Sequence, residues 1–176
     1  EPWTIETGSG GPYRVFTPFW KTVRGLPVPQ PLPAPDALPA PDRWPASDTL
    51  QDWSLDAAMN RGAAVVLPWQ RVGEDAAQSR LAEFLETKVD RYATHRDLLA
   101  EDGTSGLSEN QTYGEIGPRR IWHAGRAAME RGAAGAEAFL RELVWREFAW
   151  HLLYHYPDLP RANWKSEWNG FPWRAD

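Results

Sequence analysis

The chain has no cysteine among its 176 residues. This absence excludes a disulfide framework, a thiolate nucleophile and a cysteine-ligated zinc site. It also fits a reducing cytoplasm, where we expect the protein to reside. No run of 18 or more apolar residues occurs, so we expect no membrane span. Residues 1–5 lack the basic flank and apolar core of a signal peptide.

The chain also lacks an excess of basic residues, because 24 Asp and Glu outnumber 19 Lys and Arg and give a formal net charge of −5 at pH 7. A protein held to nucleic acid by bulk charge is usually basic, so DNA binding would have to rely on a local patch. Tryptophan, in contrast, is abundant, with 11 residues. We assign most of these indoles to core and interface packing.

Proline separates the chain into three parts. Residues 1–24 contain an extended, strand-like piece at Trp3–Glu6, a glycine-rich turn and then an aromatic stretch. Residues 25–73 hold nine prolines, which exclude regular structure over most of that segment. Apolar side chains recur within it, so we predict a long connector fixed to a protein surface rather than a free tether. The side chains expected to fix it are Trp44, Trp53, Leu55, Leu67 and Trp69.

Helical periodicity begins at Glu74. Apolar residues recur at three- and four-residue steps over 74–92, which predicts an amphipathic helix. A second helix is expected between Gly117-Pro118 and Arg131-Gly132, with proline at its first position. The third, over 136–156, is apolar around nearly its whole axis, which is typical of a helix buried in a core. We therefore expect a mostly α fold.

A run of glycine and hydroxyl residues, Gly103-Thr104-Ser105-Gly106-Leu107-Ser108, lies between the first two predicted helices. Such residues can surround a phosphate with hydroxyl and backbone N–H donors. The alternative is an ordinary turn, in which Gly106 is the turn residue and Ser105 or Ser108 caps a helix. Both interpretations stay open from the residues alone.

Three functional side chains in the last predicted helix share one face. Glu142, Trp145 and Arg146 stand at positions i, i+3 and i+4. An indole can stack on a nucleobase, a carboxylate can accept base N–H groups, and a guanidinium can bind a phosphate. The alternative is a structural Glu142–Arg146 ion pair beside a core tryptophan.

Histidine supplies a weaker signal. His151 and His155 are four residues apart, as zinc ligands on one helix can be. No third ligand stands at a useful spacing. We interpret both as hydrogen-bonded core histidines and predict no metal site.

Four segments, in order, resemble motifs of the DNA photolyase/cryptochrome family. Residues 11–21 resemble the string that closes the family's α/β antenna domain, and the 103–108 loop with 113–119 is similar to its flavin-phosphate motif. Residues 142–148, followed by His151-Leu152, resemble its signature helix, and 163–173 resemble the loop that follows. The resemblance is closest to a class I-like cyclobutane pyrimidine dimer photolyase.

The resemblance implies a division of the chain. Residues 1–24 correspond to the C-terminal end of the antenna domain, 25–73 to the interdomain connector, and 74–176 to the N-terminal half of the helical FAD-binding domain. It implies a partial chain of a monomeric flavoenzyme that splits pyrimidine dimers in DNA with blue light. The chain alone is expected to be inactive, and no catalytic residue within it is assigned.

The sequence departs from the family's motifs at two positions. Gly106 stands where the family commonly has arginine, and Gly117 replaces a usual serine. A folate- or deazaflavin-type antenna chromophore is implied mostly outside this chain. The alternatives to a photolyase are a cryptochrome-type photoreceptor and a non-catalytic helical interaction module.

The resemblance also implies site residues. The implied FAD-binding residues are Tyr92, Thr104, Ser105, Gly106, Leu107, Ser108 and Phe139, and the implied lesion- and DNA-binding residues are Glu142, Trp145 and Arg146.

Overall fold

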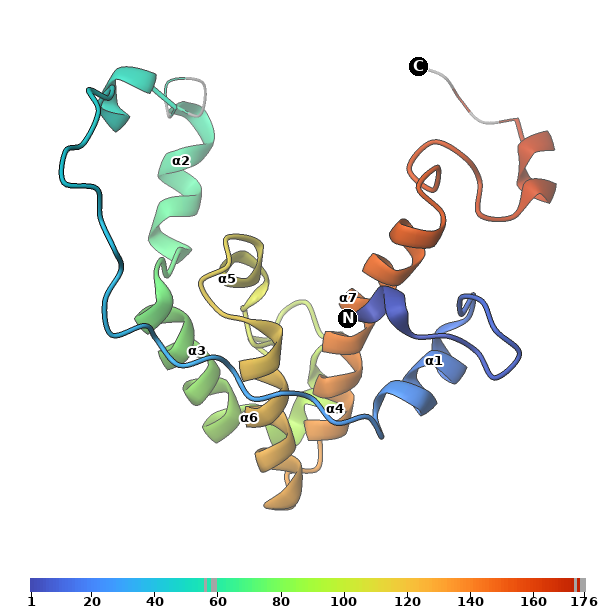
Figure 1. Ribbon diagram of the computed structural model, residues 1–176. Helices are drawn as coiled ribbons and strands as arrows, with labels where there is room; N and C mark the ends of the chain where they lie inside the picture. The colour runs from blue at the N-terminus through green and yellow to red at the C-terminus, as the bar shows by residue number, and fades with distance from the viewer. Residues whose placement is uncertain (56, 58–59, 173, 175–176) are drawn as a thin grey trace.

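The computed structural model describes residues 1–55, 57, 60–172 and 174 and is built from helices (Figure 1). Within these residues there is no β-strand beyond a single antiparallel bridge between Glu6 and Pro12. The described part also contains no helix long and apolar enough to cross a membrane. The α-helices are α1 (Phe16–Val23), α2 (Asn60–Val66), α3 (Glu74–Thr87), α4 (Tyr92–His95), α5 (Ser108–Thr112), α6 (Pro118–Glu130) and α7 (Ala136–His155). Short 3-10 turns lie at Pro2–Thr4, Leu50–Trp53, Leu67–Trp69, Val89–Arg91 and Ser166–Gly170.

The three long helices confirm the sequence prediction. α3 begins at Glu74, as expected, and the predicted helix over 74–92 is completed by a 3-10 turn and by α4. α6 begins at Pro118, whose missing N–H is no loss at a first helical position. α7 ends at His155, because the residue before Pro157 is disfavoured in helical conformation.

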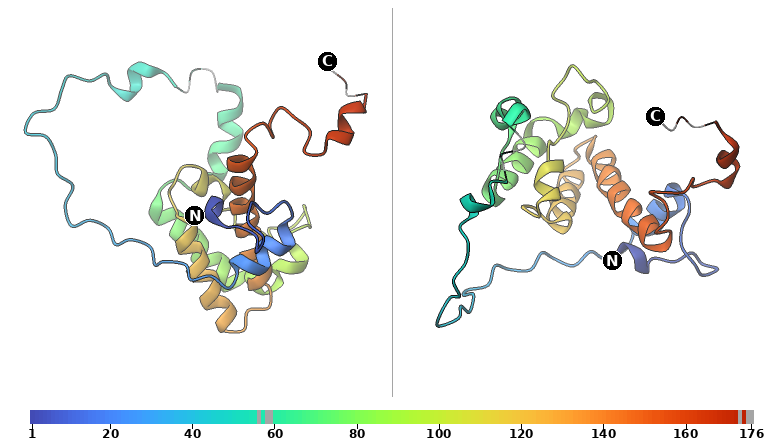
Figure 2. Two further views of the ribbon diagram at one scale, coloured as in Figure 1. Left: turned by 45° about the vertical axis from the view of Figure 1, so that its right-hand side comes forward. Right: turned by 90° about the horizontal axis from the view of Figure 1, so that it is seen from above.

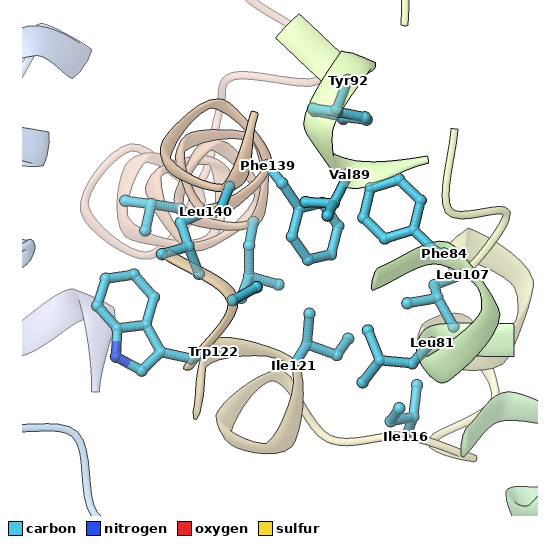
Figure 3. Packing of buried hydrophobic residues seen from close by; sticks show 14 of the residues in the cluster. Leu81, Phe84, Val89, Tyr92, Leu107, Ile116, Ile121, Trp122, Phe139 and Leu140 are labelled. Carbon is cyan, nitrogen blue, oxygen red and sulfur yellow. The ribbon is translucent and has the colours of Figure 1, made fainter. Parts of the chain in front are cut away.

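The core lies where α3, α4, α6 and α7 meet (Figure 3). Gly125 on α6 allows α7 to approach closely, since a Cβ at this position would lie 2.7 Å from Cδ2 of Leu140. Burial of these apolar side chains supplies the main favourable term in folding. The residues at its centre are Leu81, Phe84, Val89, Tyr92, Leu107, Ile116, Ile121, Trp122, Phe139 and Leu140.

α7 is less buried than its sequence suggests. Phe139, Leu143 and Phe148 face the core, but Trp145 and Trp150 are 45% and 50% exposed. The prediction of a helix buried all round is therefore wrong. One side of α7 presents large aromatic side chains outside the core.

The N-terminal segment is helical where an extended piece was expected. Pro2–Thr4 forms a 3-10 turn, and Glu6 takes part only in the single bridge, so the strand-like prediction for Trp3–Glu6 is wrong. The aromatic stretch that follows the glycine turn forms α1. This helix lies beside α7 and buries Phe16, Phe19 and Trp20 (Figures 1 and 2).

The proline-rich segment runs away from the helical body before it returns through α2 (Figure 2). Its start is held where Nε2 of His123 lies 3.1 Å from the carbonyl oxygen of Pro29. The predicted apolar anchors do not hold its middle. This part of the prediction is wrong, because Trp44, Trp53, Leu55, Leu67 and Trp69 are all between 60% and 81% exposed.

Candidate functional site

The 103–108 loop has one buried anchor and exposed hydroxyls. Leu107 is 1% exposed and points into the core, whereas the side chains of Thr104 and Ser108 are exposed (Figure 3). Gly106 adopts φ +63°, a conformation that glycine reaches without steric cost. Gly103 has no room for a side chain, since a Cβ there would lie 2.6 Å from the carbonyl oxygen of His95. The loop therefore presents polar groups outward from a fixed backbone.

An arginine on α3, whose side chain is 12% exposed, supports this loop. Nη1 of Arg80, on α3, donates to the carbonyl oxygen of Gly106 at 2.6 Å and to Oδ1 of Asn110 at 2.9 Å. It also pairs with the carboxylate of Glu109. The hydrogen bond from Arg80 keeps the pKa of Glu109 below its ordinary value, with a further contribution from the backbone N–H of Arg71. This network closes the loop onto α3.

Asn110 extends the network to the end of the connector. Its side chain is 0% exposed, and Nδ2 donates to the carbonyl oxygen of Arg71 at 2.8 Å and to Oε2 of Glu115 at 2.6 Å. Oε1 of Glu115 accepts the backbone N–H of Gly73 at 2.8 Å. A buried amide with these partners fixes both segments. Sequence reasoning missed Arg80 and Asn110, because their partners lie on other elements.

Tyr92 and Phe139 lie inside the core rather than at its surface. They are 7% and 5% exposed and meet edge to face, with ring centroids 5.6 Å apart (Figure 3). Both rings also contact Phe84. Burial and the nearby carboxylate of Glu142 raise the pKa of the Tyr92 hydroxyl. Both rings therefore have little surface open to a ligand in this structure.

Glu142 pairs with Arg96, at the end of α4, rather than with Arg146. Burial disfavours the Arg96 cation, but Glu142 and then Asp97 outweigh this effect and raise the pKa of the guanidinium. Nη1 of Arg146 donates instead to Oε1 of Glu147 at 3.0 Å. The ion pair that sequence spacing allowed within α7 is thus replaced by one between helices.

The indole of Trp145 is stacked on one side and open elsewhere. Its ring centroid lies 3.7 Å from that of Phe16, with 9° between the planes. Phe148 meets the indole edge-on at 5.8 Å. The three α7 side chains have different neighbours, since Glu142 pairs with Arg96, Trp145 stacks on Phe16, and Arg146 lines the cavity described next. Sequence spacing gave no sign of Phe16.

A cavity of about 640 Å³ lies between the N-terminal segment, α6 and α7. Its lining is mainly apolar and includes Trp3, Trp122 and Trp150, with Arg146 at the polar part. The volume is in the range of small-molecule sites. None of residues 103–108 lines it, so it is distinct from the predicted phosphate loop.

The histidines of α7 hold the N-terminal segment. His151 is 0% exposed, with Nδ1 2.9 Å from the carbonyl oxygen of Pro2 and Nε2 3.2 Å from that of Tyr13. Nε2 of His155 lies 3.0 Å from the carbonyl oxygen of Trp3. Both histidines are hydrogen-bonded, as expected, but only His151 is a core residue, because His155 is half-buried. Across the described residues, no three His, Cys, Asp or Glu side chains gather to hold a metal ion.

Sequence comparison finds relatives that match nearly the whole chain. A protein named deoxyribodipyrimidine photo-lyase from Agrobacterium fabrum is 38% identical over 178 residues, which cover 100% of this chain and 37% of that protein. Proteins of the same name from Synechococcus sp. and Thermus thermophilus are 36% and 38% identical and cover 98% and 93% of this chain. The chain is homologous to a segment of the DNA photolyases. No family model matches it.

A solved structure agrees with the photolyase relationship. The crystal structure of a bacterial class III photolyase from Agrobacterium tumefaciens superimposes with a TM-score of 0.89 at 37% identity. The match covers 100% of this chain and 37% of that one. The resemblance had indicated a class I-like enzyme, whereas this structure is described as class III. The chain spans 35–37% of the length of these relatives.

Proposed function

We propose that this chain is part of a light-dependent DNA photolyase that splits cyclobutane pyrimidine dimers. The observation that carries the proposal is the match of 93–100% of the chain to three proteins named photo-lyase. Because the chain spans little more than a third of those relatives, the activity belongs to a longer protein. We propose that the longer protein acts in the cytoplasm as a monomer and that the 176 residues alone are not competent.

The proposed division follows the family. Residues 1–24 end an antenna domain, 25–73 connect two domains, and 74–176 begin a helical FAD-binding domain. Residues 173, 175 and 176 lie outside the described part. The buried contacts of α3, α4, α6 and α7 support assigning 74–155 to one packed unit.

The proposed cofactor is FAD, and the 103–108 loop suits its phosphates. Thr104 and Ser108 expose hydroxyl donors, Ser105 and Gly106 lie on a turn supported by Arg80, and Leu107 anchors that turn in the core. Tyr92 and Phe139 would form an aromatic wall. FAD, when bound, supplies the light-excited electron that opens the dimer ring. We propose that a folate- or deazaflavin-type antenna chromophore binds mostly outside this chain.

The lesion would be read from α7. Trp145 has exposed indole surface for stacking, which contributes about 1–3 kcal/mol per base. Glu142, oriented by Arg96, would accept N–H groups of the base edge. Arg146 would contact the flavin or the DNA backbone.

The test uses the full-length protein with reduced FAD and a single-stranded oligothymidine that carries one cyclobutane dimer. Blue light is expected to restore the intact thymines, whereas a sample kept in the dark should retain the dimer. Glu142→Ala is expected to reduce the repair yield. Glu137→Ala is the matched control on the same helix, because Glu137 is exposed and lies 3.6 Å from Arg24.

Two other outcomes would point elsewhere. Bound flavin without repair would favour the cryptochrome-type photoreceptor. A folded protein that binds no flavin would favour the non-catalytic interaction module. Either result would overturn the repair proposal.

A further inference from the structure

Two aromatic rings from distant parts of the sequence lie face to face where α1 meets α7. Phe16 is the first residue of α1, and Trp145 stands in the middle of α7. Their centroids are 3.7 Å apart and their planes differ by 9°. Figures 1 and 2 both show α1 beside α7.

The two rings differ greatly in exposure. Phe16 is 5% exposed, whereas Trp145 is 45% exposed. A parallel ring at this distance covers one face of the indole. The exposed surface of Trp145 therefore belongs to its opposite face and its outer edge. A planar ligand can reach Trp145 only from the side away from Phe16.

The surrounding packing sets the plane of the indole. Phe148 meets the ring of Phe16 at 5.8 Å and 66°, and that of Trp145 at 5.8 Å and 71°. Isolated aromatic pairs prefer offset or edge-to-face arrangements to a close parallel sandwich. The close stack is thus imposed by the helices, and Phe148 closes it from the edge.

We infer that Phe16 is a positioning residue, which holds the Trp145 indole ready to stack on a pyrimidine dimer. The inference rests on the proposed function, in which Trp145 contacts the lesion. A side chain already fixed in its bound orientation loses less rotational freedom on binding. Phe16 then sits beneath the indole, and the lesion takes the opposite face. Phe16 does not touch the DNA.

The test compares Phe16→Leu with Phe19→Leu in the full-length protein. Both residues are buried in α1, but the ring contacts of Phe19 are with Tyr13, Phe148 and His151. The probes are a single-stranded oligothymidine with one cyclobutane dimer and the same strand undamaged, titrated in the dark. Phe16→Leu is expected to weaken dimer binding roughly 2- to 10-fold, the cost of ordering one side chain. The affinity of Phe16→Leu for undamaged DNA should equal that of the wild type. Phe19→Leu should leave the ratio of the affinities for dimer-containing and undamaged DNA unchanged.

Two further variants separate positioning from folding. Phe16→Tyr keeps a flat ring, so its affinity for the dimer should match that of the wild type. Phe16→Met keeps volume without a flat ring, so it should weaken dimer binding even if Phe16→Leu fails to fold. Equal affinity ratios for Phe16→Met and the wild type would overturn the inference.

A double-mutant cycle distinguishes this inference from the proposed function. Trp145→Ala is expected to weaken dimer binding about 5- to 150-fold, the range for one stacked base. Adding Phe16→Leu to Trp145→Ala should cause no further loss, because Phe16 acts through the indole. If Trp145→Ala has no effect, the proposed lesion contact fails. If Trp145→Ala weakens binding but Phe16→Leu behaves as Phe19→Leu does, only the positioning role fails.

Discussion

Arg96, at the end of α4, donates to the carboxylate of Glu142 in the middle of α7. The two side chains are 32% and 40% exposed, so the pair is neither buried nor fully solvated. Asp97 lies 3.6 Å from Nε of Arg96 and adds negative charge to the same cation. The pair joins two helices and fixes the direction in which Glu142 points.

Arg96→Met is expected to lower the free energy of unfolding of the chain by about 1–2 kcal/mol. This is above the usual value for exposed pairs and below the cost of breaking a buried one. Chemical denaturation of the 176-residue chain measures it. Glu142→Gln should cost less, because its amide oxygen still accepts from the guanidinium. Unchanged stability of Arg96→Met would show that the pair contributes nothing to folding.

The second prediction concerns acid stability. Hydrogen bonds from Arg80 and from the backbone of Arg71 lower the pKa of Glu109 in the folded state. A carboxyl group with a lowered folded pKa stabilises the fold above its unfolded pKa, roughly 4.3, and loses that effect as pH falls through the folded pKa. Wild type should therefore exceed Glu109→Gln in unfolding free energy at pH 6. The difference should shrink steadily below about pH 4. A difference that grows on acidification would contradict this assignment.

The third prediction tests the backbone of the 103–108 loop. A Cβ at Gly103 would lie 2.6 Å from the carbonyl oxygen of His95, so Gly103→Ala must displace the loop. We expect a loss of about 1–3 kcal/mol of stability, as for other overpacked sites. In the full-length protein, FAD affinity by fluorescence titration should fall as well. Gly8→Ala is the control, since Gly8 lies outside the motif and no atom lies within 4 Å of its added Cβ. If FAD binds both variants equally, the loop does not hold the cofactor.

Local sequence signals predicted the long helices well, because their causes are local. Pro118 at a first helical position and Pro157 after the last turn mark ends that depend on neighbouring residues alone. The buried positions over 74–92 likewise follow from apolar periodicity, as Leu81 and Phe84 show. The fold class could thus be predicted from the sequence.

Contacts between distant segments could not be predicted. Spacing allowed Glu142 to pair with Arg146, yet the fold brings Arg96 closer. The stacking partner of Trp145 comes from the opposite end of the chain. Trp69 was expected to fix the connector because it is apolar, but its side chain is 81% exposed. Composition indicates which side chains favour burial, whereas the contacts that bury them are seen only in the folded structure.

The fourth prediction concerns the N-terminal segment. His151 lies on α7, and its two ring nitrogens are 2.9 Å and 3.2 Å from the carbonyl oxygens of Pro2 and Tyr13. His151→Leu leaves both oxygens without this partner in a buried site, at a cost of about 1–3 kcal/mol. Hydrogen exchange should show lost protection in residues 2–13 before any change in α3 or α6.

His123→Leu is the matched comparison. Its ring lies 3.1 Å from the carbonyl oxygen of Pro29, at the start of the connector, rather than from the N-terminal segment. We expect faster exchange in this variant at the amide of Leu26, which donates to the carbonyl oxygen of Val23 at 3.0 Å, and unchanged exchange over residues 2–13. If both variants loosen both segments alike, the effect is global unfolding. The histidines would then not act as separate attachments. Losing a hydrogen bond to one carbonyl group should reduce protection only in the segment that carries that carbonyl.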